Sequence, residues 1–313
     1  GVVQDLVAEL TALGAKRPVL VTDQGLTRTP LPNMVMALLK AGGMEAAIYD
    51  AVEPNPTDAQ VDAGAKVYAE HGGDAFVALG GGSPMDAAKA MQIRVNHHEP
   101  MEVYDDLLGG DALITEALPP LIAIATTAGT GSEVSRSAVI TIAAVARKVV
   151  LFHPGLMPRV AICDPELTYG LPAHVTAQTG MDALSHNLEA YLSPGYHPMA
   201  DGIALQAIAQ VGRYLAVAVA DPSNVVARRE MMAASFMGAV AFQKGLGVIH
   251  SLAHALGAVH HIGHGVTNAI LMPHALRFNG AVVPERVEAV GRALGFDDCS
   301  VEGCAKGIEA LME

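Results

Sequence analysis

The chain has 313 residues, of which 51% are hydrophobic and only 4% aromatic, and it contains no Trp. A core made of Ala, Val, Leu, Ile and Met favours packed helices and buried parallel strands over an all-β sandwich. Asp and Glu number 32 against 19 Lys and Arg, a net charge of −13, which argues against nucleic-acid binding because it repels a phosphate backbone.

Signals for disulfides, membrane insertion and secretion are weak. Cys163, Cys299 and Cys304 are too few and too irregularly spaced for a disulfide framework or a cysteine-based zinc site. No stretch approaches 18 consecutive apolar residues flanked by charge, and the N-terminus lacks a basic-then-apolar leader. We therefore expect a soluble cytoplasmic protein with reduced thiols that does not bind a membrane.

The first half alternates short apolar runs with helical patterns, which is typical of a parallel α/β sheet. We expect helices at residues 31–42 and 57–71 and another from about residue 83. The expected strands are residues 17–23, 44–52, 74–79, 121–125, 138–142, 148–151 and 159–163.

A glycine turn, Gly80-Gly81-Gly82-Ser83-Pro84, follows the strand at 74–79 and opens the next helix. Three glycines let the backbone approach a ligand closely. Ser83 as N-cap, with Pro84 at the first helical position, would leave N–H groups and a positive dipole end for a pyrophosphate. A tight capped turn without a ligand is the alternative, since the spacing is not Gly-x-Gly-x-x-Gly.

A threonine-rich turn, Thr126-Thr127-Ala128-Gly129-Thr130-Gly131-Ser132-Glu133, directly follows the strand at 121–125. Loops at the carboxyl ends of parallel strands are where α/β proteins place ligands, although a solvated loop is the alternative. Asp23, at the end of the first strand, could accept a hydrogen bond from a ribose hydroxyl or could be an ordinary turn or cap residue.

From about residue 172 onward, segments rich in Ala, Leu and Met follow a 3.6-residue periodicity, so this half is expected to be all helical. We place the domain boundary near residue 168, which divides the chain into 1–168 and 169–313.

This helical half carries residue types that metals accept as ligands. Asp182 and His186 are four positions apart, as are His250 and His254, so each pair projects from one face of a helix. His264 follows in the loop His260-His261-Ile262-Gly263-His264-Gly265. A mixed set of histidines and a carboxylate suits Fe²⁺ or Zn²⁺, whereas packed histidines without an ion are the alternative on spacing alone.

Taken together, these motifs resemble those of the iron-containing (group III) alcohol dehydrogenases in their order and separations, over essentially the whole chain. The motifs that carry the resemblance are Gly80-Gly81-Gly82-Ser83-Pro84-Met85-Asp86-Ala87-Ala88-Lys89, Thr126 to Glu133, Gly180-Met181-Asp182-Ala183-Leu184-Ser185-His186, and His250-x₃-His254-x₉-His264-Gly265. The resemblance implies a dehydroquinate synthase-like fold. An α/β NAD(P)-binding domain would occupy residues 1–168 and an all-α metal domain residues 169–313, with catalysis in the cleft between them.

The same resemblance assigns roles to individual residues. It implies that His254 is the catalytic histidine near the nicotinamide, exchanging protons or orienting the ring. It implies that the metal ligands are Asp182, His186, His250 and His264. It implies that the cofactor contacts are Gly81, Gly82 and Ser83 at the pyrophosphate, Thr126, Thr127 and Thr130 along the cofactor, and Lys148 at the ribose. Asp23 matches an acidic residue that favours NAD over NADP, because a carboxylate accepts from a 2′-hydroxyl but repels a 2′-phosphate.

These assignments predict a metal-dependent enzyme that transfers hydride between a primary alcohol or hydroxy acid, or the matching aldehyde, and NAD. Fe²⁺ or Zn²⁺ would serve as Lewis acid, and the enzyme would be a homo-oligomer, a dimer. Relatives within the same superfamily, of the glycerol dehydrogenase or maleylacetate reductase type, are the alternative, and the intact set of four ligands argues against the latter. A metal- or nucleotide-binding module without turnover is a further alternative that no motif supports.

The segment Phe242-Gln243-Lys244-Gly245-Leu246-Gly247 departs from the family pattern, because it is one residue shorter and carries a cation. We expect Lys244 to face solvent. If it faces the cleft instead, Phe242 and Lys244 become substrate contacts, and the ammonium could pair with an ω-hydroxy acid or a semialdehyde bearing a carboxylate. The N-terminus lacks the short leader strand region usual in the family, and the C-terminus stops where family members continue with more helices. Either this is a short form or residues are missing, and missing C-terminal helices would expose apolar surface.

Overall fold

The computed structural model describes residues 1–145, 147–260 and 262–312. They form two compact units, the first made of Gly1–Thr126 and Ser132–Leu167, the second of Thr127–Gly131 and Thr168–Glu313. Five residues of the threonine turn therefore belong to the second unit although both of their flanks belong to the first.

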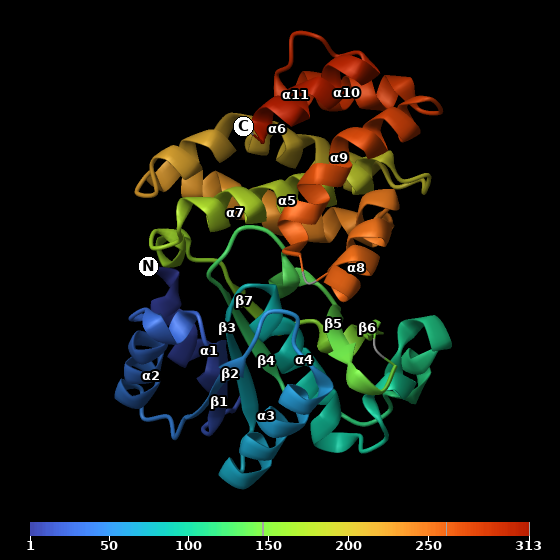
Figure 1. Ribbon diagram of the computed structural model, residues 1–313. Helices are drawn as coiled ribbons and strands as arrows, with labels where there is room; N and C mark the ends of the chain where they lie inside the picture. The colour runs from blue at the N-terminus through green and yellow to red at the C-terminus, as the bar shows by residue number, and fades with distance from the viewer. Residues whose placement is uncertain (146, 261, 313) are drawn as a thin grey trace. The chain divides into compact units, whose positions relative to one another are not determined.

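The first unit is built on a five-stranded parallel sheet with the order β2-β1-β3-β4-β7 (Figure 1). Its strands are β1 (Pro18–Asp23), β2 (Ala47–Val52), β3 (Ala75–Gly80), β4 (Leu121–Ala125) and β7 (Val160–Ile162). Every residue of β3 and β4 is buried. Helices cover both faces of such a sheet, which is why its central strands are continuous apolar runs rather than alternating ones.

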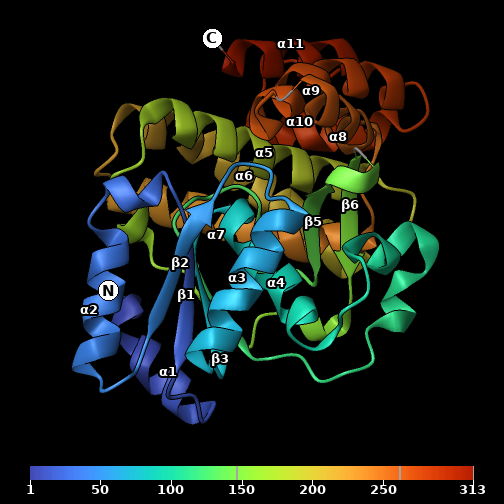
Figure 2. The ribbon, with the colours of Figure 1, turned by 60° about the horizontal axis from the view of Figure 1, so that its bottom comes forward.

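Four helices cover this sheet: α1 (Leu6–Ala12), α2 (Leu31–Ala41), α3 (Asp58–His71) and α4 (Gly82–Asn96). Figure 2 shows α1 and α2 on one side of the strands and α3 and α4 on the other. On the α2 side, Leu39 joins a buried cluster with Val77 and Ile124, whereas on the α3 side the ring of Tyr68 stacks on Phe76 at 4.5 Å between centroids. The α/β fold expected for this half is thereby confirmed as a doubly wound sheet.

The order of the sheet reverses between β1 and β3, because β2 lies on one side of β1 and β3 on the other. The carboxyl ends at this point are joined by hydrogen bonds: Thr22 Oγ1 donates to Leu79 O at 2.9 Å and Thr126 N–H donates to Gly80 O at 3.0 Å. Open α/β sheets bind their ligands at such a reversal point.

The two remaining strands of this unit, β5 (Ser137–Ile142) and β6 (Arg147–Phe152), form a separate antiparallel hairpin. Alternate residues of β5 are buried, as expected of a strand with one packed face.

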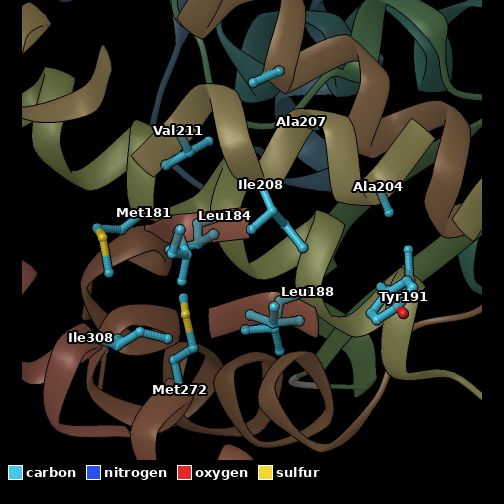
Figure 3. Packing of buried hydrophobic residues seen from close by; sticks show 14 of the residues in the cluster. Met181, Leu184, Leu188, Tyr191, Ala204, Ala207, Ile208, Val211, Met272 and Ile308 are labelled. Carbon is cyan, nitrogen blue, oxygen red and sulfur yellow. The ribbon is translucent and has the colours of Figure 1, made fainter. Parts of the chain in front are cut away.

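The second unit is helical throughout its described residues from 169 on, which confirms the all-α expectation for this half. Its helices are α5 (Ala173–Leu192), α6 (Pro198–Ala220), α7 (Val225–Ala241), α8 (Val248–His260), α9 (His264–Gly280), α10 (Pro284–Leu294) and α11 (Val301–Leu311). Figure 3 shows the core that they share, in which Leu184 and Leu188 of α5 pack with Ile208 of α6, Met272 of α9 and Ile308 of α11. Helix α5 is buried at every position from Gly180 to Tyr191, which places its side chains at the centre of the bundle.

Helix α6 is long and apolar enough to meet the criteria for a membrane span. Its buried residues, among them Ala204, Ile208, Val211 and Leu215, belong to the core of the helical unit. A single such helix is weak evidence for a membrane span, because packed helices of soluble proteins meet the same criteria.

Candidate functional site

Helix α5 carries Asp182 and His186 one turn apart, and both side chains are buried. Helix α8 contributes His250, and α9 begins at His264. One ligand atom from each of these four residues lies within 4.8 Å of the others. The structure thus brings together all four residues that the sequence predicts as metal ligands.

The distances between the donor atoms suit a small divalent ion. Bonds of about 2.1 Å in a tetrahedral arrangement require donors roughly 3.4 Å apart. Asp182 Oδ1 lies 3.6 Å from His264 Nε2 and 3.9 Å from His250 Nε2. These two pairs need to contract by a few tenths of an ångström, and all four ligand atoms lie within 4.8 Å of one another, so the donor set fits the metal that the sequence motifs imply.

The protonation states in the site also suit a cation. Burial by itself raises the pKa of Asp182, but the charges of His186, His264 and His250 outweigh burial and hold this pKa below its usual value. Burial lowers the pKa of His250 well below its usual value. At neutral pH the site therefore contains an ionised carboxylate and a neutral imidazole at position 250, the forms that bind metals.

The amide of Asn268 lies among the ligand atoms. Its Nδ2 donates to Asp182 Oδ1 at 2.7 Å and lies 3.3 Å from His250 Nε2 and 3.2 Å from His264 Nε2. One oxygen and two ring nitrogens of the predicted ligands thus surround the NH₂ group of Asn268. Asn268 was missed by the sequence reasoning, although it stands four residues after His264 on the same helix, the spacing that revealed the other pairs.

Two rings flank the metal ligands. The ring centroid of His254 lies 6.1 Å from that of His250 and 5.4 Å from that of His264. Phe242 approaches from the 3₁₀ helix Phe242–Lys244 and lies 5.0 Å from the ring of His186. His254 and Phe242 are therefore both close to the ligand set, whereas His261 of the predicted histidine loop lies outside the described residues.

The expectation that Lys244 faces solvent is wrong. Its side chain is 1% exposed, and its Nζ donates to Asp201 Oδ1 at 2.6 Å and to Tyr191 O at 3.2 Å. Arg286 binds the same carboxylate at 2.8 Å. A buried ammonium needs such partners, and the Nζ of Lys244 already donates to Asp201 and to the Tyr191 carbonyl.

The glycine turn begins its helix earlier than the sequence predicts. Gly81 is the N-cap and α4 begins at Gly82, so Ser83 is not the cap and Pro84 is not the first helical residue. The chain turns one residue before the cap, at Gly80, whose φ is +152°. A Cβ on Gly80 would lie 2.6 Å from Pro84 Cγ and 3.3 Å from Asp23 Oδ2, so only glycine fits here.

Asp23 lies beside this glycine turn at the carboxyl end of β1. Its Oδ1 accepts from Leu26 N–H at 2.9 Å, so it does serve as a turn residue, one of the two alternatives considered from the sequence. Its Oδ2 is the atom close to Gly80. The first unit therefore places a carboxylate next to Gly80, the residue that precedes the N-cap of α4.

The other predicted cofactor contacts are divided between the units. Thr126 directly follows β4 in the first unit, whereas Thr127 and Thr130 belong to the second. Lys148, on β6, donates to Asn55 Oδ1 at 2.7 Å. Burial lowers the pKa of Lys148 while Asp86 opposes the shift.

The threonine turn is not the solvated loop considered as an alternative, because Gly129 and Gly131 are buried. A Cβ on Gly131 would lie 2.4 Å from Ala239 Cβ of α7, and a Cβ on Gly129 would lie 2.8 Å from Thr179 Cβ of α5. Small residues here let the turn approach both helices. As a result the Gly129 carbonyl reaches His186, whose Nδ1 lies 3.3 Å from it.

Comparison with known proteins agrees with this architecture. Residues 1–165 match the iron-containing alcohol dehydrogenase family, and residues 176–313 match the C-terminal region of the Fe-containing alcohol dehydrogenase family. The 4-hydroxybutyrate dehydrogenase of Cupriavidus necator is 42% identical over 307 residues, which cover 95% of this chain and 80% of that protein. The NAD-dependent methanol dehydrogenase of Bacillus methanolicus is 38% identical over 313 residues, 100% of this chain and 81% of that protein.

A solved structure of similar fold is the alcohol dehydrogenase from Oenococcus oeni. It superposes with a TM-score of 0.94 at 33% identity, over 99% of this chain and 82% of that one. The chain therefore belongs to the iron-containing alcohol dehydrogenase family, which confirms the resemblance carried by its motifs and makes it an oxidoreductase that acts on alcohols.

Proposed function

We propose that this protein is an NAD-dependent dehydrogenase of primary alcohols, loaded with Fe²⁺ or, where zinc is more available, Zn²⁺. Asp182, His186, His250 and His264 hold the metal. The observation that carries this proposal is the convergence of their four ligand atoms within 4.8 Å of one another. When bound, the ion would act as a Lewis acid toward the alcohol or aldehyde oxygen; NAD accepts the hydride of the alcohol, and NADH returns it to the aldehyde.

The residues of the chain prepare this chemistry. Asp182 supplies the negative charge of the ligand set, and the three histidines supply nitrogen lone pairs. His254, whose ring lies 5.4 Å from that of His264, is our candidate for proton exchange with solvent. Phe242 contributes an apolar wall beside His186, where the carbon chain of a substrate would lie.

At the sheet edge, Gly81, Gly82 and Ser83 offer backbone N–H groups to the pyrophosphate at the start of α4. Asp23 favours NAD, because its carboxylate accepts from a ribose hydroxyl and repels a 2′-phosphate. We assign Thr126, Thr127 and Thr130 to contacts along the cofactor and Lys148 to its ribose, in keeping with the family motifs.

The relatives suggest a class of substrate. One acts on 4-hydroxybutyrate and another on methanol by their names, so we propose short primary alcohols, including those with a second polar end. We further propose a homodimer located in the cytoplasm.

The test combines metal analysis with an activity panel. Protein stripped of metal by a chelator should not reduce NAD with any alcohol of the panel, and anaerobic addition of Fe²⁺ should restore NADH formation from NAD and the alcohol. His264→Ala should abolish metal binding, whereas His274→Ala, which removes an exposed histidine of the same helix, should leave it intact. Full activity of metal-free protein would overturn the proposal. A panel of methanol, 1,3-propanediol and 4-hydroxybutyrate would rank the substrates.

A further inference from the structure

We propose that Glu189 is a positioning residue that fixes both the ring and the backbone of His250, so that Nε2 of this histidine faces the ion. The inference rests on the metal site proposed above. When one ring nitrogen of a histidine ligates a metal, the hydrogen-bond partner of the other nitrogen fixes the orientation of the ring and the position of its proton. A carboxylate is a strong partner of this kind.

Glu189 has the right place in the fold for this role. It lies seven residues after Asp182 on α5, close to two full turns, so both side chains project from the same side of the helix. Its side chain is fully buried, and its Oε2 lies 2.6 Å from His250 Nδ1. A contact this short involves Nδ1–H as donor, because the carboxylate can only accept. The lone pair then lies on Nε2, the nitrogen 3.9 Å from Asp182 Oδ1.

The same carboxylate also binds the first turn of α8. Oε1 accepts from Ile249 N–H at 2.6 Å, and Oε2 accepts from His250 N–H at 3.3 Å. A Cβ on Gly247 would lie 2.8 Å from Oε1, so glycine at this position makes room for the carboxylate. A negative charge at a helix N-terminus is favourable, and here it anchors the backbone of a metal ligand together with its ring.

His186 provides an internal comparison. Its Nδ1 faces a neutral carbonyl, Gly129 O, at 3.3 Å. The corresponding partner of His250 Nδ1 is the carboxylate of Glu189, and at 2.6 Å it lies 0.7 Å closer than the Gly129 carbonyl lies to His186. Loss of Glu189 should therefore disturb the ligand set at His250 specifically.

The variant Glu189→Gln tests this idea while preserving shape. The side-chain carbonyl of Gln can still accept from the α8 backbone, but its NH₂ then donates to Nδ1 and moves the imidazole proton to Nε2, the ligating nitrogen. We expect Zn²⁺ affinity, measured by competition with a chromophoric chelator, to fall about 10- to 100-fold. Glu230→Gln is the matched control, since Glu230 also lies in the helical unit and is partly buried, with a hydrogen bond from Gln210.

A second measurement needs neither metal nor activity. Nitrogen-15 NMR of metal-free protein labelled at histidine reports which ring nitrogen carries the proton, with His250→Ala identifying the signal. Wild type should show His250 protonated at Nδ1, and Glu189→Gln should show it protonated at Nε2, with His186 unchanged.

The outcomes separate this inference from the proposed function. Wild-type protein that binds no Zn²⁺ would remove the metal site, whereas the proton position would still report on Glu189. A wild-type His250 protonated at Nε2, or a Glu189→Gln protein with unchanged proton position and affinity within twofold of wild type, would overturn the role of Glu189. The wild-type spectrum decides the question even if the variant does not fold.

Discussion

Replacing Lys244 with Met separates two roles for a buried cation. If its ammonium belongs to the framework, as its pairing with Asp201 indicates, the variant should lose stability and treat acidic and neutral substrates alike. If the ammonium binds a substrate carboxylate, stability should hold, and the KM for 4-hydroxybutyrate should rise far more than that for 1,3-propanediol.

The size of the stability effect follows from the contacts. Breaking a buried ion pair by removing one partner costs about 3–5 kcal/mol. Asp201 keeps Arg286 at 2.8 Å and is 24% exposed, so water and the guanidinium compensate part of the loss, and Met preserves the packing of the alkyl chain. We expect Lys244→Met to lower the free energy of unfolding by about 2–3 kcal/mol.

Urea unfolding followed by far-ultraviolet circular dichroism is the suitable assay, because the chain has no Trp. A double-mutant cycle with Asp201→Asn should give a coupling of about 1–2 kcal/mol. The reasoning is refuted if Lys244→Met unfolds within about 0.5 kcal/mol of wild type while the KM for the acid alone increases.

Three further predictions concern the carboxylate of Asp23, the packing of the threonine turn and the acid stability contributed by Asp201. Asp23→Asn keeps the turn acceptor but removes the charge, so kcat/KM with NADP relative to NAD should rise about tenfold or more; an unchanged ratio would remove Asp23 from cofactor selection. Gly131→Ala places a Cβ 2.4 Å from a methyl of α7 at φ +63° and should cost about 2–4 kcal/mol in urea unfolding. Gly202→Ala, with nothing near its Cβ, should be neutral or stabilising, and equal effects would contradict the packing argument. Burial raises the pKa of Asp201, but hydrogen bonds from Lys244 and Arg286 outweigh burial and hold this pKa below the usual 3.8. The ionised Asp201 therefore stabilises the fold above pH 3.8, and this stabilisation is lost as the pH falls further. Asp201→Asn should flatten that part of the acid-unfolding curve, and an unchanged curve would show that the pair adds nothing.

The parallel strands could be predicted because burial on both faces demands an unbroken apolar run, as in β3 and β4. The pair Asp182 and His186 could be predicted for a related reason, since the sequence itself gives the spacing of two residues on one helix. Such features depend on neighbours within a few residues.

The features that were missed depend on distant neighbours. Ser83 is a residue type typical of an N-cap, but the helix starts earlier, at Gly82. The approach of Asp23, 57 positions before Gly80, is one reason why that position must be glycine, and no local pattern indicates it. Lys244 and Asp201 are 43 residues apart, so no local pattern indicates that the cation is paired. Glu189 could have been found seven residues after Asp182, yet its partner on α8 is 61 residues away.

The five residues Thr127–Gly131 impose a constraint on how the molecule can be divided. They pack within the helical unit but are covalently flanked by the α/β unit on both sides, so no single cut yields a complete helical unit. A fragment of residues 169–313 would lack the Gly129 carbonyl that faces His186 Nδ1, so this proposed metal ligand would lose the partner of its Nδ1. Exchange of domains between relatives must therefore transfer this short insert together with the helices, as two separate pieces of the gene.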